Sequence, residues 1–313
     1  MQIPIRSSEE FHRLLFALVD ELVDAQIHFN LYQDLVAAIP EYSTEFNQSN
    51  TFWSLTFSAH LDATVLRICK AYDQYRSDKP SLNLTSLLDT IDANLHLFDE
   101  PNFRERLKGN PFVDSLAETN RRPDPARLKQ DKLSVSNSDP LVKKLTIWRN
   151  NFFAHRSTKQ ALDAKGLVGR YPLLISEIGT LLATGVAIVN RYSSLFVATS
   201  HSTGIVGRDD YKWLLKAARE SLDAYEARIQ KQINQVSRAS LTLRRHRSLA
   251  TWKEAPQTPR CATSRSSNWQ TVSTTPLTKR KPGASAMNWA EWFLVRRPHF
   301  PVDAALLLAY TSK

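Results

Sequence analysis

The chain has 313 residues, of which 42% are hydrophobic, so it is long enough and apolar enough to bury a core. Its formal net charge of +10 is concentrated near the C-terminus: residues 1–237 hold 28 Lys and Arg against 28 Asp and Glu, and residues 238–313 hold 13 against 3. This balance excludes a broad basic surface on residues 1–237. Any affinity of that part for nucleic acid must come from a local cluster of residues.

The cellular compartment is predicted from the secretory, disulfide and membrane signals of the sequence. Polar residues soon after Met1 take the place of the basic and apolar regions of a secretory signal, and Cys69 and Cys261 stand in segments of different character, which argues against a disulfide framework. The most apolar stretch, Pro172 to Val189, contains Glu177, and its uncharged run is too short to span a bilayer. We therefore expect a cytoplasmic protein with no membrane association and a buried helix at this stretch.

Helical spacing dominates the N-terminal half. Ser7 followed by Glu10 is a capping-box pattern, and the apolar residues after it predict one long amphipathic helix that ends before Pro40. A second helix is predicted over residues 50–75, apolar around much of its circumference, and a third over residues 84–98.

The pattern resumes after a polar stretch over residues 100–124, which holds only short helical pieces. A helix is predicted from Pro125, and Ser138-Asp139-Pro140 predicts the start of another, with proline in its first turn, which leads into Arg149. A further helix is predicted from Pro172 to about Phe196.

The last predicted helix begins at Asp209 and Asp210, and its apolar residues fall on one face as far as Ile233. No strand pattern is present, so we expect an all-α helical bundle. After about Val236 the composition changes to Arg, Ser, Thr and Pro, which predicts a basic tail that is mostly disordered. The expected organisation is a helical domain over residues 1–236 and this tail over residues 237–313.

One segment carries candidate chemistry: Trp148-Arg149-Asn150-Asn151-Phe152-Phe153-Ala154-His155-Arg156. Its arginine, following polar residue and later histidine resemble the motif of the HEPN superfamily. Further stretches resemble the AbiU-type abortive-infection branch of that superfamily, namely Phe52-Trp53-Ser54-Leu55, Leu61 to Arg67, Ala71-Tyr72-Asp73 and Pro140 to Leu145. The resemblance covers roughly residues 8–236.

The resemblance implies a dimeric, HEPN-like all-α domain in which two copies of the motif face each other across a two-fold axis and cleave RNA without a metal or other cofactor. It implies a toxin of a toxin–antitoxin or phage-defence system, restrained by an antitoxin partner. The residues permit this chemistry: His155 can transfer protons near neutral pH, and Arg149 can hold the charge that develops on phosphate. Asn150 can orient the phosphate or the imidazole, and Arg156 can attract substrate.

Helix geometry constrains how these residues meet. On a continuous α-helix, Arg149 and His155 would project about 120° apart and lie about 9 Å apart along the axis. Either the helix ends or bends near Ala154, or the same residues of a second subunit complete the site.

A non-catalytic use of the same residues stays open. Arg149 can pair with a nearby acid, and a histidine near a helix C-terminus is stabilised by the helix dipole. The chain would then be a helical module that binds nucleotide, RNA or another protein. No other histidine has metal-ligand spacing. Asp62 and Asp73, three turns apart on one predicted helix, are expected to pair within that helix with Arg67 and Lys70.

Overall fold

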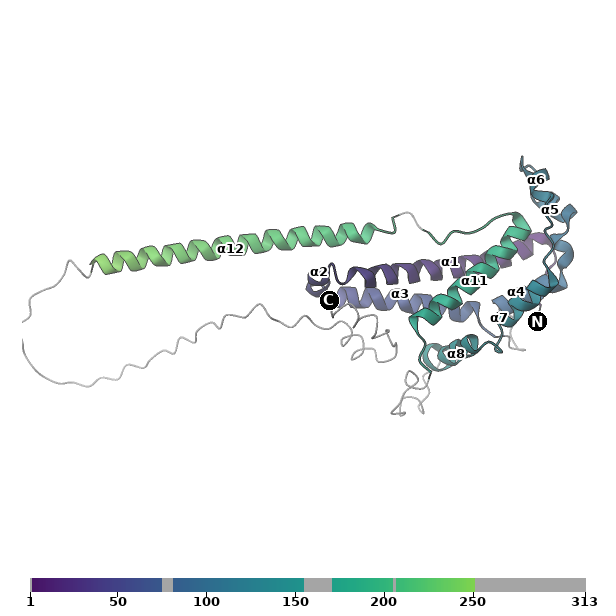
Figure 1. Ribbon diagram of the computed structural model, residues 1–313, viewed down its shortest axis with the longest axis horizontal. Helices are drawn as coiled ribbons and strands as arrows, with labels where there is room; N and C mark the ends of the chain where they lie inside the picture. The colour runs from purple at the N-terminus through teal and green to yellow at the C-terminus, as the bar shows by residue number, and fades with distance from the viewer. Residues whose placement is uncertain (1, 75–80, 155–170, 205–206, 251–313) are drawn as a thin grey trace, which may run out of the picture. The chain divides into compact units, whose positions relative to one another are not determined.

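The computed structural model describes residues 2–74, 81–154, 171–204 and 207–250, and these residues form an all-helical fold, as predicted (Figure 1). The helices are α1 (Ser8–Ala38), α2 (Ser43–Gln48), α3 (Asn50–Ala71), α4 (Leu84–Ala93), the 3-10 helix η1 (Leu95–Phe98), α5 (Glu100–Arg106), α6 (Val113–Ala117), α7 (Pro125–Ser134), α8 (Pro140–Trp148), the π-helix η2 (Arg149–Ala154), α11 (Ile175–Val197) and α12 (Asp210–Ala250). The chain divides into two units between Tyr211 and Lys212.

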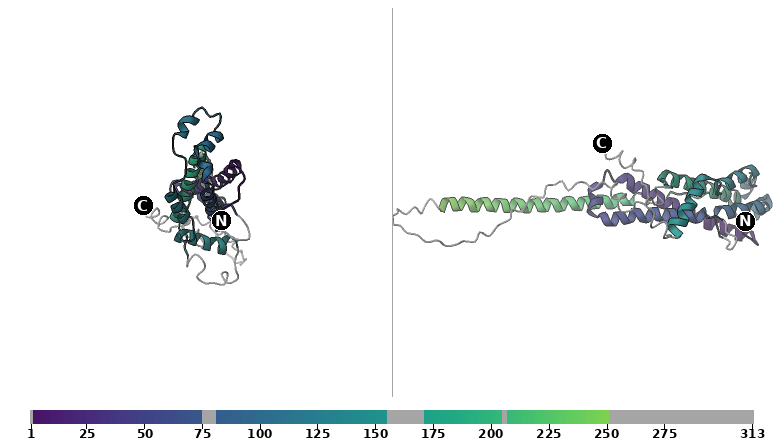
Figure 2. Two further views of the ribbon diagram at one scale, coloured as in Figure 1. Left: turned by 90° about the vertical axis from the view of Figure 1, so that its right-hand side faces the viewer. Right: turned by 90° about the horizontal axis from the view of Figure 1, so that it is seen from below.

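Two long helices of the first unit, α1 and α3, lie side by side in the views of Figures 1 and 2. They run in opposite directions, because Lys70 donates to Glu21 (Nζ to Oε1, 3.0 Å) near one end while the Tyr32 and Phe57 rings meet near the other. Arg67 also reaches α1, 3.4 Å from Glu21. The expectation that Arg67 and Lys70 pair within their own helix is therefore wrong.

The start of α1 follows the predicted cap. The Ser7 hydroxyl accepts the backbone N–H of Glu10 at 3.2 Å, as an N-cap serine does. The Glu10 carboxylate accepts the backbone N–H of Arg6 at 2.7 Å, one residue before the position that a complete capping box uses.

Between α1 and α3, two half-buried histidines share a hydrogen bond, with Nδ1 of His28 2.9 Å from Nδ1 of His60. Burial lowers the pKa of both imidazoles; Arg67 lowers that of His28 further, and His28 lowers that of His60. The folded protein thus binds these protons less readily than the unfolded chain does. The stability that the neutral pair contributes is present above the ordinary histidine pKa of 6.5 and is lost as the pH falls below it.

We therefore expect the free energy of unfolding to fall with pH in this range, and to fall less in a His28→Gln/His60→Gln variant. Urea denaturation at a series of pH values between about 7.5 and 5.5, one unit either side of the histidine pKa, measures this. His96→Gln, at an exposed histidine, is the control. The same pH dependence in the double variant and the native protein would contradict the expectation.

Helix α11 completes the core by packing against both α1 and α3. The approach to α1 is close, because a Cβ at Gly185 would lie 2.9 Å from Cδ2 of Leu22. Tyr72, just after α3, donates its hydroxyl to the carbonyl of Leu181 at 2.7 Å. By length and composition α11 is the one helix among the described residues that could cross a bilayer, a test that core helices also pass. Its packing agrees with the predicted buried helix.

The end of this bundle is closed by aromatic rings and one arginine. Phe11, Phe98 and Phe196 meet edge to face with centroids 4.8 to 5.7 Å apart. The guanidinium of Arg106 lies 3.9 Å from the Phe196 ring centroid and donates to the carbonyl of Leu97 at 2.6 Å. Burial lowers the pKa of Arg106 to about 10, so it stays charged at neutral pH.

Several element boundaries differ from the sequence-based expectation. Helix α2 was not predicted, and the helix expected over residues 84–98 is broken at Asn94, whose amide donates to the carbonyl of Thr90 at 2.8 Å. An asparagine that bonds to local backbone competes with the helical ladder, which explains the break. Helix α12 runs to Ala250, beyond Ile233, the last residue of the apolar face predicted for this helix.

Candidate active site

Helix α8 brings Arg149 to the site, and its start is well capped. One carboxylate oxygen of Asp139 accepts the backbone N–H groups of Leu141 (2.8 Å) and Val142 (3.2 Å), and Pro140 occupies the first turn. This is the start that Ser138-Asp139-Pro140 predicts. An aspartate at the N-cap satisfies orphan N–H groups and complements the helix dipole.

Two contacts fix the other end of α8. Trp148, immediately before the motif arginine, is fully buried, and its indole N–H donates to the carbonyl of Tyr171 at 2.5 Å. Lys144 forms an ion pair with Glu177 in the first turn of α11, and the same carboxylate accepts the backbone N–H of Leu174 at 2.8 Å. The backbone of Arg149 therefore starts from an anchored helix end.

The α-helix ends at Trp148, and residues Arg149–Ala154 continue as a π-helix. Single π-turns of this kind are rare and occur frequently at functional sites. On a continuous α-helix, Arg149 and His155 would project in different directions. One of the two arrangements predicted to bring them together required the α-helix to end or bend near Ala154. The α-helix ends earlier than that, before the motif begins, so the 120° phase calculated for a continuous α-helix does not describe this segment.

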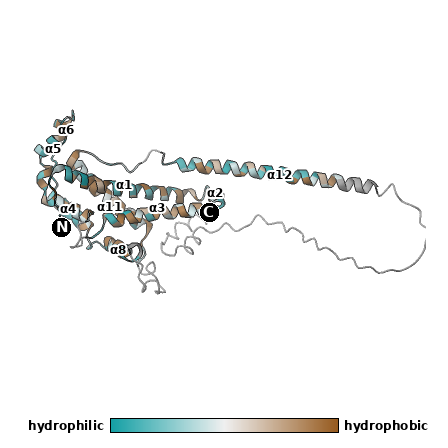
Figure 3. Ribbon diagram, turned by 180° about the vertical axis from the view of Figure 1, so that it is seen from behind, coloured by the Kyte–Doolittle hydropathy of each residue, from teal (hydrophilic) through white to brown (hydrophobic). Residues whose placement is uncertain are grey.

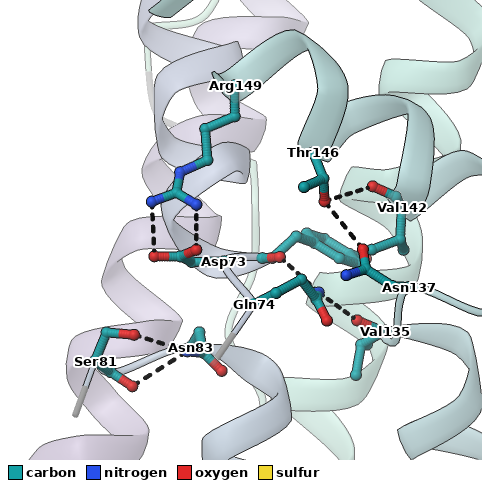
Figure 4. A network of polar contacts seen from close by, with 10 residues as sticks. Asp73, Gln74, Ser81, Asn83, Val135, Asn137, Val142, Thr146 and Arg149 are labelled. Atoms are coloured by element: carbon teal, nitrogen blue, oxygen red, sulfur yellow. Dashed lines mark hydrogen bonds and ion pairs between the residues drawn. The ribbon is translucent and has the colours of Figure 1, made fainter. Parts of the chain in front are cut away.

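Arg149 is held by Asp73, the second residue after the end of α3 (Figure 4). Nη1 pairs with one carboxylate oxygen of Asp73, and Nη2 donates to the other at 3.0 Å. The side chains are 24% and 19% exposed, so both stay in reach of solvent. A bidentate pair of this kind fixes the plane of the guanidinium as well as its position.

The backbone around Asp73 is itself fixed. Gln74 donates its amide to the carbonyls of Tyr72 (3.0 Å) and Val135 (3.2 Å), which joins the end of α3 to the segment before α8 (Figure 4). Cys69 lies one turn earlier in α3, and burial raises the pKa of its thiol to about 12. The thiol is therefore neutral at pH 7 and is no nucleophile.

Of the other predicted site residues, Asn150 lies within the part of the chain that the structure describes. Asn150 is exposed, whereas Asn151 donates its amide to the carbonyl of Ile147 at 2.7 Å and so is used within the helix. Of the two asparagines, Asn150 is the one whose side chain is open to solvent. His155 and Arg156 lie outside the described residues.

Sequence reasoning assigned no site role to Asp73. It lies 76 positions from Arg149 in the sequence, and spacing along one helix favoured a pair with a neighbouring lysine or arginine. The only signal was its place in Ala71-Tyr72-Asp73, one of the stretches that carry the family resemblance.

A hollow between α7 and α11 is lined by residues that include Arg127, Asp131 and Arg191, and by none of the predicted site residues. The buried Asp131 carboxylate accepts the Tyr192 hydroxyl at 2.9 Å and pairs with Arg191 and Arg127, so its charge is compensated from both helices. Within the described ranges no three His, Cys, Asp or Glu side chains come together as metal ligands would.

No curated protein and no solved structure matches the chain. A family model does match: HEPN_AbiU2, described as AbiU2, over residues 8–212. The match covers more than half of the chain and spans α1 to α11, including Asp73 and the complete segment from Arg149 to His155. The chain belongs to the HEPN_AbiU2 family.

Proposed function

We propose that the chain is an endoribonuclease that cleaves RNA without a metal ion, through Arg149, Asn150 and His155. The observation that carries the proposal is the partly exposed guanidinium of Arg149, oriented by Asp73 and placed beside the exposed Asn150 within the family's motif segment. A fixed cation at a surface position can stabilise the charge of a phosphorane-like transition state without reorganising.

The proposed reaction uses the RNA's own 2′-hydroxyl. The 2′-oxygen forms a bond to phosphorus while the bond from phosphorus to the 5′-oxygen breaks, which leaves a 2′,3′-cyclic phosphate and a 5′-hydroxyl. His155 moves a proton in this step, and Arg149 binds the non-bridging oxygens. Asn150 orients the phosphate by its amide, and Arg156 adds attraction for the substrate.

Two copies of the chain are part of the proposal. Phe52, Leu55 and Leu66 are exposed large apolar residues on α3, at helical spacings that place them on one face. Such a stripe on the helix that leads to Asp73 supports association of two copies near the site. A homodimer of this kind would bring two Arg149 side chains and two motif segments together about a two-fold axis.

The biological role that fits is a toxin of a toxin–antitoxin or abortive-infection system, active on RNA in the cytoplasm and held by an antitoxin partner until it is needed. Because residues 1–237 have no excess of positive charge, substrate binding would depend on the local arginines of the motif.

One observation favours a second candidate function. The bidentate pair between Arg149 and Asp73 satisfies the arginine without any substrate. In that case the chain is a non-catalytic helical module that binds nucleotide, RNA or a protein and uses the pair to stabilise its fold.

The ribonuclease and the non-catalytic module can be distinguished by expressing native protein, His155→Ala and a control variant in cells. We expect native protein to slow growth and shorten the life of cellular RNA, and His155→Ala to do neither. Lys143→Ala, at an exposed lysine of α8, should behave as native. Purified native protein should also cleave RNA in excess chelator and leave the matching 2′-deoxy strand intact. Equal growth and equal RNA decay for native protein and His155→Ala would remove the enzymatic proposal.

A further inference from the structure

Helix α12 carries an apolar seam with a strict seven-residue period. Leu215, Leu222, Ile229 and Val236 follow one another at intervals of seven within its 41 residues. The residues three positions after each of them are Ala218, Tyr225, Gln232 and Ala239. Together they fill the a and d positions of four consecutive heptads, with one polar member.

This period differs from that of a straight helix packed on a globular body. Seven residues of a straight α-helix fall about 20° short of two turns, so a strict seven-residue seam drifts round the helix unless two helices wind about each other. Heptads sustained over about four repeats indicate a coiled coil.

The first a residue of the seam, Leu215, is buried, and the seam is open to solvent from Tyr225 onward. Tyr225 is 55%, Ile229 37%, and Val236 65% exposed, and Ile233, next to the seam, is 53% exposed. Apolar and polar residues alternate along α12 in Figure 3. A solitary helix with exposed aliphatic residues is marginally stable in water, so a partner helix would stabilise it.

We infer that α12 forms a parallel, two-stranded coiled coil with α12 of a second copy of this chain. Gln232 points to a second copy rather than a foreign helix, because in a parallel pair in register it faces its own counterpart. An amide donates and accepts equally, so two facing amides satisfy each other, whereas an aliphatic partner would leave the amide unpaired.

The flanking charges and core residues agree with this register. In a parallel pair the flanking positions bring Ser221 opposite Glu226 and Arg228 opposite Ile233, so no like charges meet. An antiparallel pair with Ile229 opposite Tyr225 would instead set Glu226 against Glu226 of the other copy. The β-branched Ile229 and Val236 at a positions are residues that parallel two-stranded coiled coils use there, although no d position holds the leucine that completes this preference.

The coiled coil does not depend on the proposed ribonuclease activity, and its test uses no activity assay. In the full chain with Cys261→Ser, Ile229→Cys is expected to give a disulfide-linked dimer under mild oxidation. Ala227→Cys, on the outer face of α12, should give none above background. Cross-linking at residue 229 is local to α12, so association through any other surface does not produce it.

A second variant measures affinity by sedimentation over a concentration series. Ile229→Glu should raise the dimer dissociation constant at least about 100-fold, because it places a charge in the seam. Ala227→Glu should leave the constant unchanged. The thermal transition of the first unit reports that each variant is folded. A native chain that is monomeric at all concentrations, or cross-linking no stronger at residue 229 than at residue 227, would overturn the inference.

Discussion

Arg149→Ala is expected to lower the rate of RNA cleavage by about 10²- to 10³-fold, the loss that follows removal of one positioned group that stabilises transition-state charge. The prediction rests on the proposed ribonuclease function. The substitution removes the guanidinium that Asp73 orients and leaves the buried anchor Trp148 in place. Single-turnover cleavage of a labelled RNA, with enzyme in excess, measures the chemical step separately from product release.

Asp73 supplies the internal test of this prediction, because it acts through Arg149. Asp73→Asn keeps the shape of the side chain but removes its charge, so it should weaken the orientation of Arg149 and lower the rate by roughly tenfold. The double variant Asp73→Asn/Arg149→Ala should be no slower than Arg149→Ala alone, because residues that act as one unit are not additive. If the loss of rate in the double variant equalled the product of the two single losses, Asp73 would not act through Arg149.

Stability must be measured for the same variants. Leaving one member of a partly buried charge pair without its partner costs about 1–3 kcal/mol. All rates should therefore be compared well below the melting temperature of the weakest variant. Lys143→Ala again serves as the control, since it removes a positive charge from the exposed face of the same helix. A native cleavage rate in Arg149→Ala would contradict the assigned role.

Local signals in the sequence were sufficient to predict the helices that carry the site. Ser7 and Asp139 cap α1 and α8 as predicted, because an N-cap bond spans only two or three residues. The apolar period placed α3 and α11 in the core for the same reason: burial of one face needs no knowledge of which residues lie opposite.

Contacts between distant segments could not be predicted in this way. The pair of Arg149 with Asp73 depends on how α3 ends and on how α8 packs, neither of which leaves a periodic trace in the sequence. The π-helix over Arg149–Ala154 was likewise not predicted from the residues that form it. The angular spacing of Arg149 and His155 predicted that one unbroken α-helix could not direct both side chains at a single phosphate. It could not predict where the α-helix would end.

The end of α12 was not predicted from composition. The helix continues to Ala250, past the change to Arg, Ser and Thr after Val236. A long helix can carry polar residues on all but one narrow seam, and mean composition does not detect such a seam. Its seven-residue period is the informative signal.

Trp148→Ala is expected to cost about 3–5 kcal/mol of folding free energy, a larger loss of stability than we expect for Arg149→Ala or Asp73→Asn. Trp148 is the largest of the fully buried side chains of the core, and its removal leaves a cavity where α8 meets η2. It also leaves the carbonyl of Tyr171 without the indole N–H that now donates to it at 2.5 Å. A domain stable by roughly 5–15 kcal/mol would lose a large part of its margin.

Trp213→Ala is the matched control, because it makes the same chemical change at a side chain that is 71% exposed. We expect it to alter the free energy of unfolding by no more than about 0.5 kcal/mol. The free energy of unfolding of Trp148→Phe should lie between those of Trp148→Ala and Trp213→Ala, since phenylalanine keeps most of the apolar volume and loses the hydrogen bond. Urea denaturation followed by circular dichroism gives the three values. If Trp148→Ala were no less stable than Trp213→Ala, Trp148 would not be the anchor of α8, and the orientation of Arg149 would have to depend on Asp73 and Lys144 alone.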